Sequence, residues 1–400
     1  MVFFDASSTT PVDKRVVEKM LPYFGEKYGN PSSHIHSVGV EAGKALDDAR
    51  GQVAELINAR PGEVYFTSGA TESNNLAVVG YLNAHPDSGK HIILSEIEHF
   101  SILNIGYKLK RLGYEVDFLP VDNNGLVSSA DLENAITPRT SLVSIQHASS
   151  EIGTIQNIKR LAEIAHQSGI FFHTDSTAGA GNIPADVEDL GVDCMTLSAH
   201  NFYGPKGAGA IYLKNGMRVS SLFEGGFQED GLRPGTENLP GIVGMGAASE
   251  LAMREIESRN KKLVSLRQKF WNGLNDKIEF IHFTGHPEKR LPGHVSFWIE
   301  FVEGESLQLM LSMQGIMASS GSACSSNLKG EDEEDLKASH VLSSVGVPEE
   351  FCSGSLTFNM TMDADESDVD YVLDKLPPIV ERLMSMSPMY ADYLKKRNDS

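Results

Sequence analysis

Cysteine is scarce in this chain, and no two cysteines have the spacing of a metal or redox motif. Cys194, Cys324 and Cys352 are the only three in 400 residues, which excludes a disulfide framework and fits a reducing compartment. No apolar run approaches the ~18 residues that a membrane span needs. The first residues lack a basic region followed by an apolar stretch, so no signal peptide is predicted. We therefore expect a cytoplasmic protein.

Positive charge is also in short supply. Lys and Arg number 34 against 54 Asp and Glu, which gives a formal charge of -20 and a pI near 5.0. Without a basic stripe, the chain has little to bind a nucleic acid or an anionic membrane surface, which argues against both as partners. The length predicts two or three domains, and the 40% hydrophobic content is enough for a large core.

From about Val16 to Met253 the chain alternates segments of helical apolar spacing with short β-type segments. Residues 37–59 predict a helix, and strands are predicted at 63–68, 91–99, 114–121, 141–149, 171–176 and 193–200. This alternation is typical of an α/β protein with a large, doubly wound, mostly parallel sheet. Such a sheet binds its ligands at the carboxyl ends of its strands.

The pattern changes after about Leu251, where a long polar helix (255–274) leads into shorter strands at 294–301 and 355–360. We expect a large α/β domain at 15–254 and a smaller α+β domain formed by 1–14 and 255–400. Residues 327–337 (NLKGEDEEDLK) carry a block of like charge, which predicts a solvated, mobile loop.

Residues of the kind that bind phosphate follow several predicted strands. Ala70 and Thr71 stand between a strand and a helix, where free backbone N–H groups make an anion site, although a tight turn with an N-cap Thr explains them equally well. A purely structural role is also open for the other candidates. These are Ser198 and His200 in SAH, Arg233 and Thr236 in GLRPGTEN, and His99 in IEHFS.

Asp175 and the run SAHN together indicate a cofactor. An acid at one strand end and a Ser-x-His-x run at a nearby one form a usual seat for pyridoxal phosphate, whose ring nitrogen pairs with the acid. The run ends, however, in Asn201, and a side-chain amide cannot form the Schiff base that a lysine amine forms. The sequence therefore predicts a cofactor seat without its covalent anchor.

Cys324 stands in GSACSS, a Gly/Ser-rich turn just before the acidic segment. Such a thiol should be exposed. It is either an incidental surface cysteine or a reactive group, and we favour the second because an exposed free thiol is a liability that usually has a purpose.

Together these motifs resemble those of the cysteine desulfurases, fold-type I pyridoxal-phosphate enzymes of the class V aminotransferase superfamily. The resemblance runs nearly end to end, through YGNPSSHIHSVG, FTSGATESNNLA, IEHFSIL, HTD, SAHNFYGPKGAGAIYL, GGFQEDGLRPGTENLPGIVG, VEGESL and GIMASSGSACSS followed by SHVL. It implies a homodimer, L-cysteine as substrate and a role in iron–sulfur cluster assembly. In the family a loop cysteine takes sulfur from the substrate and passes it to a scaffold protein, and Cys324 occupies that position.

The resemblance also assigns roles to a cofactor-holding group that this chain retains. Asp175 would pair with the ring nitrogen, and His99 would stack on the ring. The phosphate would be bound by the remaining members, which are Ala70, Thr71, Ser198, His200 and, from the other subunit, Thr236.

The group that would react with substrate is replaced. Asn201 occupies the position of the Schiff-base lysine, and Thr357 occupies the position of an Arg that clamps the substrate. Three further positions also differ from the family. Ser149-Ser150 replaces an Asn-Asn pair, Ala178 replaces a Gln, and Ala6 replaces an Asn. The loop after Cys324 is longer than usual, with Ala338 where a proline-containing segment is expected. Because general acid–base catalysis alone contributes roughly 10²–10⁴-fold in rate, ordinary desulfuration should be slow or absent.

Three functions stay open from the sequence. We favour a desulfurase-family protein of iron–sulfur assembly in which pyridoxal phosphate is bound, if at all, without a covalent bond. Cys324 would then accept sulfur or be one ligand of a [2Fe–2S] cluster shared with the scaffold. The alternatives are a working desulfurase that uses non-covalent cofactor or another base, such as Lys206, and a non-catalytic regulatory subunit of an active paralogue.

Overall fold

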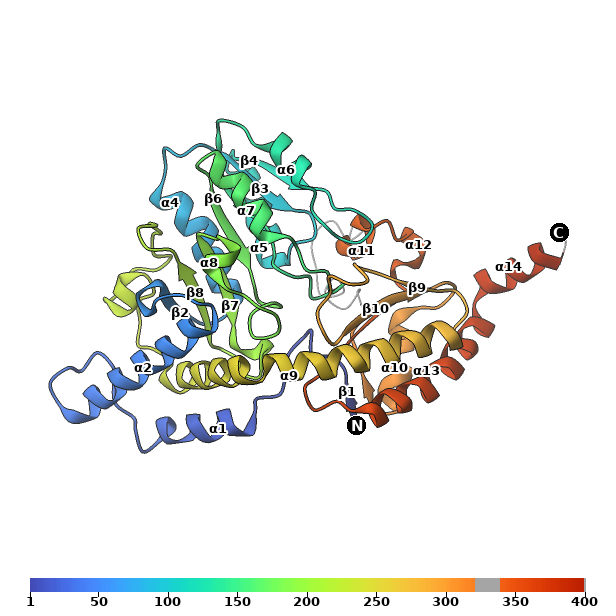
Figure 1. Ribbon diagram of the computed structural model, residues 1–400. Coiled ribbons are helices and arrows are strands. Elements are labelled where there is room, and N and C mark those ends of the chain that lie inside the picture. Colours follow the sequence, from blue (N-terminus) through green and yellow to red (C-terminus); the bar gives the residue numbers. More distant parts are fainter. Residues whose placement is uncertain (321–338, 399–400) are drawn as a thin grey trace.

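A seven-stranded sheet lies at the centre of the larger part of the molecule (Figure 1). The computed structural model describes residues 1–320 and 339–398. The strand order is β2 (Val64–Thr67), β8 (Gly209–Leu213), β7 (Cys194–Ser198), β6 (Phe171–Asp175), β5 (Thr140–Ser144), β3 (His91–Ser95) and β4 (Glu115–Leu119). β8 pairs antiparallel with both of its neighbours, and the other pairs are parallel. The predicted doubly wound, mostly parallel sheet is confirmed.

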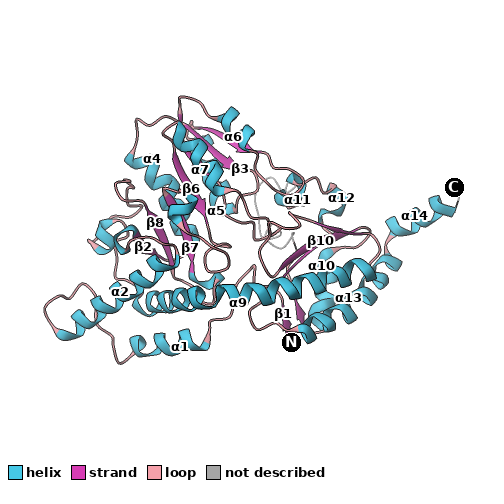
Figure 2. Ribbon diagram, in the orientation of Figure 1, coloured by secondary structure: helices cyan, strands magenta, loops and turns pink. Residues whose placement is uncertain are grey.

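Helices cover both faces of this sheet (Figure 2). Alternate strand residues point to opposite faces, so neighbours such as Phe171 and Phe172 belong to different apolar clusters. One face packs against α2 (Ser37–Leu56), α6 (Ser129–Ala135), α7 (Ile158–Gln167), α8 (Val187–Leu190) and the first half of α9 (Leu239–Lys277). The other packs against α5 (Phe100–Arg111) and the segment α3 (Ala70–Asn75), η3 (Leu76–Gly80) and α4 (Tyr81–Ala84).

A second core is built on a three-stranded antiparallel sheet, β12 (Ser355–Asn359), β10 (His294–Ile299) and β9 (Ile281–Phe283). Beside it, β1 (Val2–Phe3) pairs in parallel with β11 (Ile316–Met317). Phe4, Phe270 and Phe358 meet edge to face, with centroids 5.1–6.4 Å apart. Val2 and Phe4 thus pack into this core.

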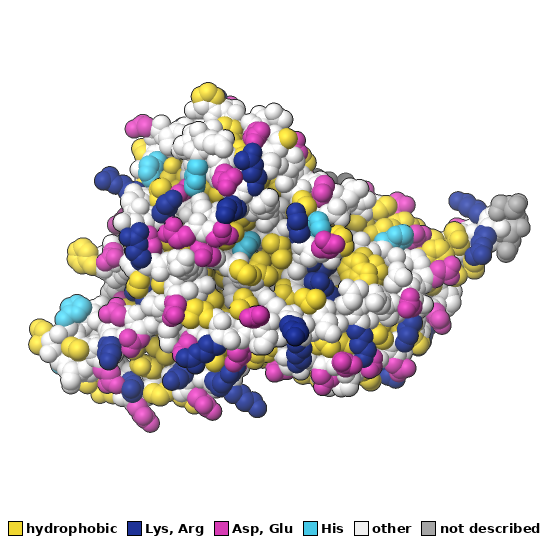
Figure 3. Space-filling view, in the orientation of Figure 1, with side chains coloured by type: hydrophobic (Ala, Val, Ile, Leu, Met, Phe, Trp, Pro, Cys, Tyr) yellow, Lys and Arg dark blue, Asp and Glu magenta, His cyan; other side chains and the backbone are white. Residues whose placement is uncertain are grey.

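The helices of the second core are α10 (Gly304–Met313), α11 (His340–Ser344), α12 (Glu349–Cys352), α13 (Glu366–Met386) and α14 (Pro388–Asn398). The larger part also contains one more helix and four short turns. These are α1 (Lys14–Met20), η1 (Leu21–Phe24), η2 (Pro61–Glu63), η4 (Ala199–Asn201) and η5 (Gln228–Gly231). Basic and acidic side chains are interspersed over the face seen in Figure 3.

The long helix α9 corrects one sequence prediction. It begins at Leu239 rather than near residue 255, because Asn238 caps its start and the Gly/Ala-rich stretch that follows packs tightly on α2. A Cβ at Gly246 would lie 2.8 Å from Ala49 Cα, so only glycine permits this approach. The expected domain boundary at 254/255 falls inside this helix and stays a prediction. Within the described chain no helix is long and apolar enough to cross a membrane.

One loop of the large sheet is fastened to the second core residue by residue. Ser150, Glu151 and Ile152 offer their carbonyl oxygens to His294 Nε2 (3.0 Å), Thr357 Oγ1 (3.0 Å) and Ser296 Oγ (3.4 Å). Further along the loop, Gly153 O accepts a hydrogen bond from Leu291 N, and Thr154 Oγ1 accepts one from His286 N, both at 2.9 Å. Ile155 N then donates to Lys289 O at 2.9 Å. This row of hydrogen bonds fixes the two cores relative to each other.

Candidate functional site

The predicted site residues His99, Asp175 and Ser198 come together at the carboxyl edge of the sheet. Asp175 and Ser198 are the last residues of β6 and β7, and His99 follows β3 and begins α5. Because these strands are parallel, their carboxyl ends meet at one edge. The juxtaposition expected from the sequence is therefore present.

Asp175 is joined to His99 by two side chains that sequence reasoning missed. Asn74 Nδ2 donates to Asp175 Oδ2 at 2.7 Å and to Ser101 Oγ at 2.8 Å, and Ser101 Oγ lies 2.7 Å from His99 Nδ1. Thr177 N donates to the other carboxylate oxygen at 2.9 Å. This chain of contacts holds both the acid and the imidazole in fixed orientations. Asn74 lies inside the motif FTSGATESNN, but only the fold shows which strand end it faces.

The turn between β2 and α3 carries Ala70 and Thr71. It needs glycine, because Gly69 has φ +152° and a Cβ at Gly209 would lie 2.5 Å from Gly69 Cα. Thr71 is exposed at the start of α3, where backbone N–H groups are free of helical partners. The turn can therefore receive an anion.

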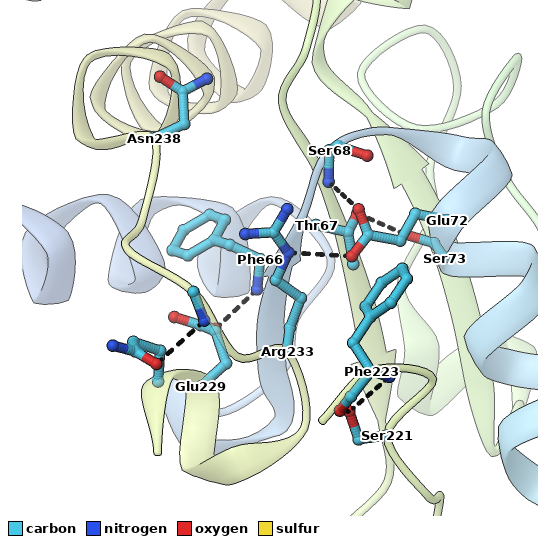
Figure 4. Close-up of polar contacts among 12 residues, drawn as sticks. Phe66, Thr67, Ser68, Glu72, Ser73, Ser221, Phe223, Glu229, Arg233 and Asn238 are labelled. Atoms are coloured by element: carbon cyan, nitrogen blue, oxygen red, sulfur yellow. Dashed lines mark hydrogen bonds and ion pairs between the residues drawn. The ribbon is translucent and has the colours of Figure 1, made fainter. Parts of the chain in front are cut away.

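Glu72 braces this turn against the segment that carries Thr236 (Figure 4). Its carboxylate accepts from Ser68 N at 2.8 Å and from Arg233 Nε at 2.9 Å. Burial alone would raise the pKa of Glu72, but these two donors outweigh it and lower the pKa below its ordinary value. Thr236, three residues beyond Arg233, is exposed.

His200 and Asn201 lie in the short turn η4 that follows β7. Thr10 donates to His200 O from both N and Oγ1 at 2.9 Å, which ties the N-terminal segment to the turn. Burial and the charge of Lys206 lower the pKa of His200, so its ring is neutral at neutral pH. Asn201 is buried, and its backbone carbonyl oxygen accepts a hydrogen bond from Asn182 Nδ2 at 3.1 Å.

Unpaired polar atoms collect at this edge. Nine buried side-chain nitrogen or oxygen atoms in the described part of the chain have no hydrogen-bond partner, and six of them lie here: those of Asn74, Ser95, Glu98, Thr177, Ser198 and Asn201. Since buried polar groups are nearly always paired, this edge is built to receive a polar ligand.

The replaced residues do not all meet. Ala6, Ser150, Ala178 and Asn201 line one cavity of about 30 Å³ at the boundary of the two cores. Thr357 instead lies in β12 and hydrogen-bonds to the 149–156 loop, and Ser149 Oγ accepts from the backbone of the same loop at 3.3 Å. These other two positions serve the contact between the cores.

Cys324, the acidic segment 327–337 and Ala338 lie outside the described residues. The described chain resumes at Ser339, close to the site. Ser339 Oγ donates to the Glu151 carboxylate, and His340 Nε2 lies 3.0 Å from Glu98 O. Burial raises the pKa of Glu151 to about 7 and that of Glu98 to about 8. Among the described residues no group of three His, Cys, Asp or Glu side chains is arranged to hold a metal ion.

Residues 2–372 match the family described as aminotransferase class-V. The chain belongs to this family. Within it, the chain is 48% identical to a cysteine desulfurase IscS of Methanosarcina thermophila, over 97% of this chain and 94% of that protein. It is 46% identical to cysteine desulfurase IscS 1 of Archaeoglobus fulgidus, over 98% and 100%. A solved NifS-like protein shares the fold with a TM-score of 0.88 and 36% identity, over 95% of this chain and 99% of that one.

The chain therefore has the fold-type I architecture that its motifs predicted, and it belongs to the cysteine desulfurase group of the family.

Proposed function

We propose that this chain is a cysteine desulfurase-family protein of iron–sulfur cluster assembly whose pyridoxal-phosphate chemistry is impaired or absent. The observation that carries the proposal is Asn201, a buried amide beside a cofactor-holding group that is otherwise retained. The names of the relatives support the enzyme class and the pathway. The loss of chemistry rests on the residue type at position 201.

The retained residues fit the cofactor. Asp175 would face its ring nitrogen and His99 its ring, with the phosphate near Ser198, whose Oγ is buried and lacks a partner in the described chain. The rest of the holding group is Ala70, Thr71, His200 and Thr236. When bound, pyridoxal phosphate supplies an aldehyde that captures a primary amine and a ring that withdraws electrons. The neutral His200 ring can donate one hydrogen bond to a phosphate oxygen without bringing a charge.

The reacting end of the site has no basic nitrogen at position 201. The Asn201 amide neither attacks a carbonyl nor accepts a proton at neutral pH, so the cofactor would be held without a covalent bond to this residue. His99 remains as a group that can hold a proton at Nε2, because its Nδ1 faces Ser101 Oγ. A single positioned acid–base group of this kind does not replace an amine that captures a carbonyl.

A scaffold protein and a second subunit complete the proposed function. Cys324 would accept sulfur made elsewhere, or serve as one of the four thiolate ligands of a [2Fe–2S] cluster shared with scaffold cysteines. Dimerisation would cover exposed apolar side chains between α1 and α2. These are Leu21, Phe24, Tyr28 and Ile35, with exposed fractions of 60–100%. Large exposed apolar groups this close in sequence are typical of an interface.

Optical spectra of the purified protein, before and after addition of pyridoxal phosphate, test the proposal. Wild type should bind the cofactor reversibly, lose it on dialysis and release sulfide from L-cysteine at background rate. Asn201→Lys should acquire a visible band that survives dialysis, whereas Asn201→Gln, which lengthens the side chain without supplying an amine, should not. Brisk sulfide release by wild type would refute the impaired chemistry.

The scaffold role has its own test. Wild type and Cys324→Ala should be compared for retention of a [2Fe–2S] cluster during size-exclusion chromatography with a cognate scaffold. We expect the cluster to be lost from the complex with the variant. Equal retention would exclude a ligand role for Cys324, and elution of wild type as a heterodimer with a paralogue would support a regulatory subunit instead.

A further inference from the structure

Thr236 lies at the base of a loop that closes on itself, which we call the Thr236 loop (residues 225–236). Gln228 Oε1 accepts a hydrogen bond from Gly235 N at 3.0 Å, so the two limbs of the loop are held together. Thr236 is exposed, and the ring of Phe227 is 95% exposed on the same loop. A large apolar side chain held out in solvent fits a surface that a second copy of the chain covers.

The middle of the Thr236 loop has an unfavourable backbone conformation. Glu229 and Asp230 have φ angles of 49° and 56°, in the left-handed region that residues with a Cβ rarely adopt. Only Gly231, with φ 79°, takes this conformation without a steric penalty. Two non-glycine residues in succession do not choose it by local preference, so contacts outside the loop must hold them there.

The carboxylate of Glu229 makes these contacts. Its side chain is 1% exposed, and Arg50 of α2 donates to its two oxygens from Nη1 and Nη2, each at 2.7 Å. Phe66 N of β2 donates to the same carboxylate at 2.7 Å, and Arg50 Nη1 also donates to Val64 O at 2.7 Å. Because β2 is an edge strand, these backbone groups belong to its free side. Glu229 is therefore fixed to the rigid edge of the large sheet by a bidentate, charge-assisted pair.

A second pair of opposite polarity fixes the other limb of the loop (Figure 4). Here the loop supplies the arginine: Arg233 Nε donates to Glu72, which also accepts from Ser68 N. Ser68 N and Phe66 N come from alternate residues, so both pairs use the same side of one strand. A loop shifted so that Arg233 met Arg50 would oppose like charges. The two pairs together therefore allow a single placement of the loop.

We propose that Glu229 is a positioning residue, which holds the Thr236 loop in the conformation that presents Thr236 to the phosphate of pyridoxal phosphate in a second copy of this chain. The inference rests on the proposed function, which assigns Thr236 to the partner's phosphate site. Glu229 acts through Thr236, because its own carboxylate is occupied by Arg50 and Phe66 N. Without that carboxylate the left-handed turn relaxes and Thr236 moves away from the phosphate.

A double-mutant cycle in cofactor affinity tests this coupling. By fluorescence titration of the dimer, the Kd for pyridoxal phosphate should rise about tenfold in Thr236→Ala, as expected for the loss of a hydrogen bond to a charged group. Glu229→Ala should raise it similarly, and the double variant should bind no more weakly than Thr236→Ala alone. Leu274→Ala, which opens a cavity in the second core, should lower stability and leave the Kd unchanged. Additive losses, or an unchanged Kd in Glu229→Ala, would overturn the proposal.

Mixed dimers decide which subunit the loop serves. Two chains with different affinity tags are co-expressed, and heterodimers are purified on both tags. A Ser198→Ala chain paired with a Glu229→Ala chain should retain one site of wild-type affinity, because both changes then weaken the same site. Both changes on one chain paired with wild type should leave two weakened sites. The reverse pattern would mean that the loop serves its own subunit, and the proposal would be wrong.

Hydrogen exchange on the cofactor-free protein examines the loop by itself. Amides of residues 228–236 should exchange faster in Glu229→Ala than in wild type, and at the wild-type rate in Leu274→Ala. Glu229→Gln, which keeps the shape but loses the charge, replaces Glu229→Ala if circular dichroism shows that the alanine variant is unfolded. Equal exchange in wild type and the Glu229 variant would overturn the proposal. Failure of wild type to bind pyridoxal phosphate would instead refute the proposed cofactor, and with it this role of Thr236.

Discussion

Replacing Glu98 with Gln should change how the stability of this protein depends on pH. The Glu98 side chain is fully buried, with Oε1 accepting from Gln146 N at 2.7 Å and Oε2 unpaired within the described residues. Burial, reinforced by the nearby charge of Asp175, raises its pKa from 4.5 to about 8. Glu98 is therefore protonated in the folded protein at neutral pH but ionised in the unfolded chain.

The sign follows from proton linkage. Because the folded pKa is the higher one, the stability contribution is fully present below pH 4.5 and is lost as the pH rises through about 8. The loss is about 1.4 kcal/mol per pH unit between these limits, and about 5 kcal/mol in total. Glu98→Gln is neutral in both states and lacks this loss.

Urea unfolding at pH 5, 6, 7 and 8 at constant ionic strength measures the effect. The free energy of unfolding of Glu98→Gln minus that of wild type should rise by about 1.4 kcal/mol per pH unit. Any constant offset from fitting an amide into the pocket cancels in this slope. Glu288→Gln, on an exposed residue, should give a flat difference. A flat difference for Glu98→Gln would mean that the carboxyl is ionised in the fold, and the reasoning would fail.

Three further changes test other parts of the structure. Arg50→Met removes the ion-pair partner of the buried Glu229 carboxylate (2.7 Å away), which keeps a hydrogen bond from Phe66 N, and should cost about 3–5 kcal/mol of unfolding free energy. Adding Glu229→Gln should recover part of this loss, and additive losses in a urea double-mutant cycle would contradict the pairing. Asn74→Leu removes a hydrogen bond to Asp175 that is worth about 1.5–3 kcal/mol. Pyridoxal phosphate should therefore bind at least tenfold more weakly in a fluorescence titration. Unchanged affinity would exclude this positioning role for Asn74. Ile35→Asp puts a charge on a fully exposed apolar residue, and sedimentation should show a monomer if that surface forms the dimer, whereas an intact dimer would place the interface elsewhere.

The sequence located residues whose positions depend on local signals. Asp175 and Ser198 end short strands that the sequence predicted, and a parallel sheet brings such ends to one edge, so their position at that edge could be predicted before the fold was known. The helix at 37–56 was equally accessible, because its apolar spacing lies on one face. These features need no knowledge of which segments meet.

Features that depend on tertiary contacts escaped prediction. β8, which begins at Gly209 in a glycine-rich stretch, was not predicted, although it joins the edge strand β2 to the rest of the sheet. The first half of α9 is rich in glycine, a poor helix former, and becomes helical because small residues let it approach α2. Asn74 was hidden for a different reason: its partners Ser101 and Asp175 lie far along the chain and come within reach only after folding.

The 39-residue helix α9 makes the two halves of the molecule inseparable. Its first half buries Ile242, Met245 and Ala248 in the large core, and its second half buries Leu266 and Phe270 in the smaller one. Dividing the chain anywhere within α9 would leave each fragment with only part of this helix and with apolar core residues uncovered. Expressing either half alone should therefore yield insoluble material.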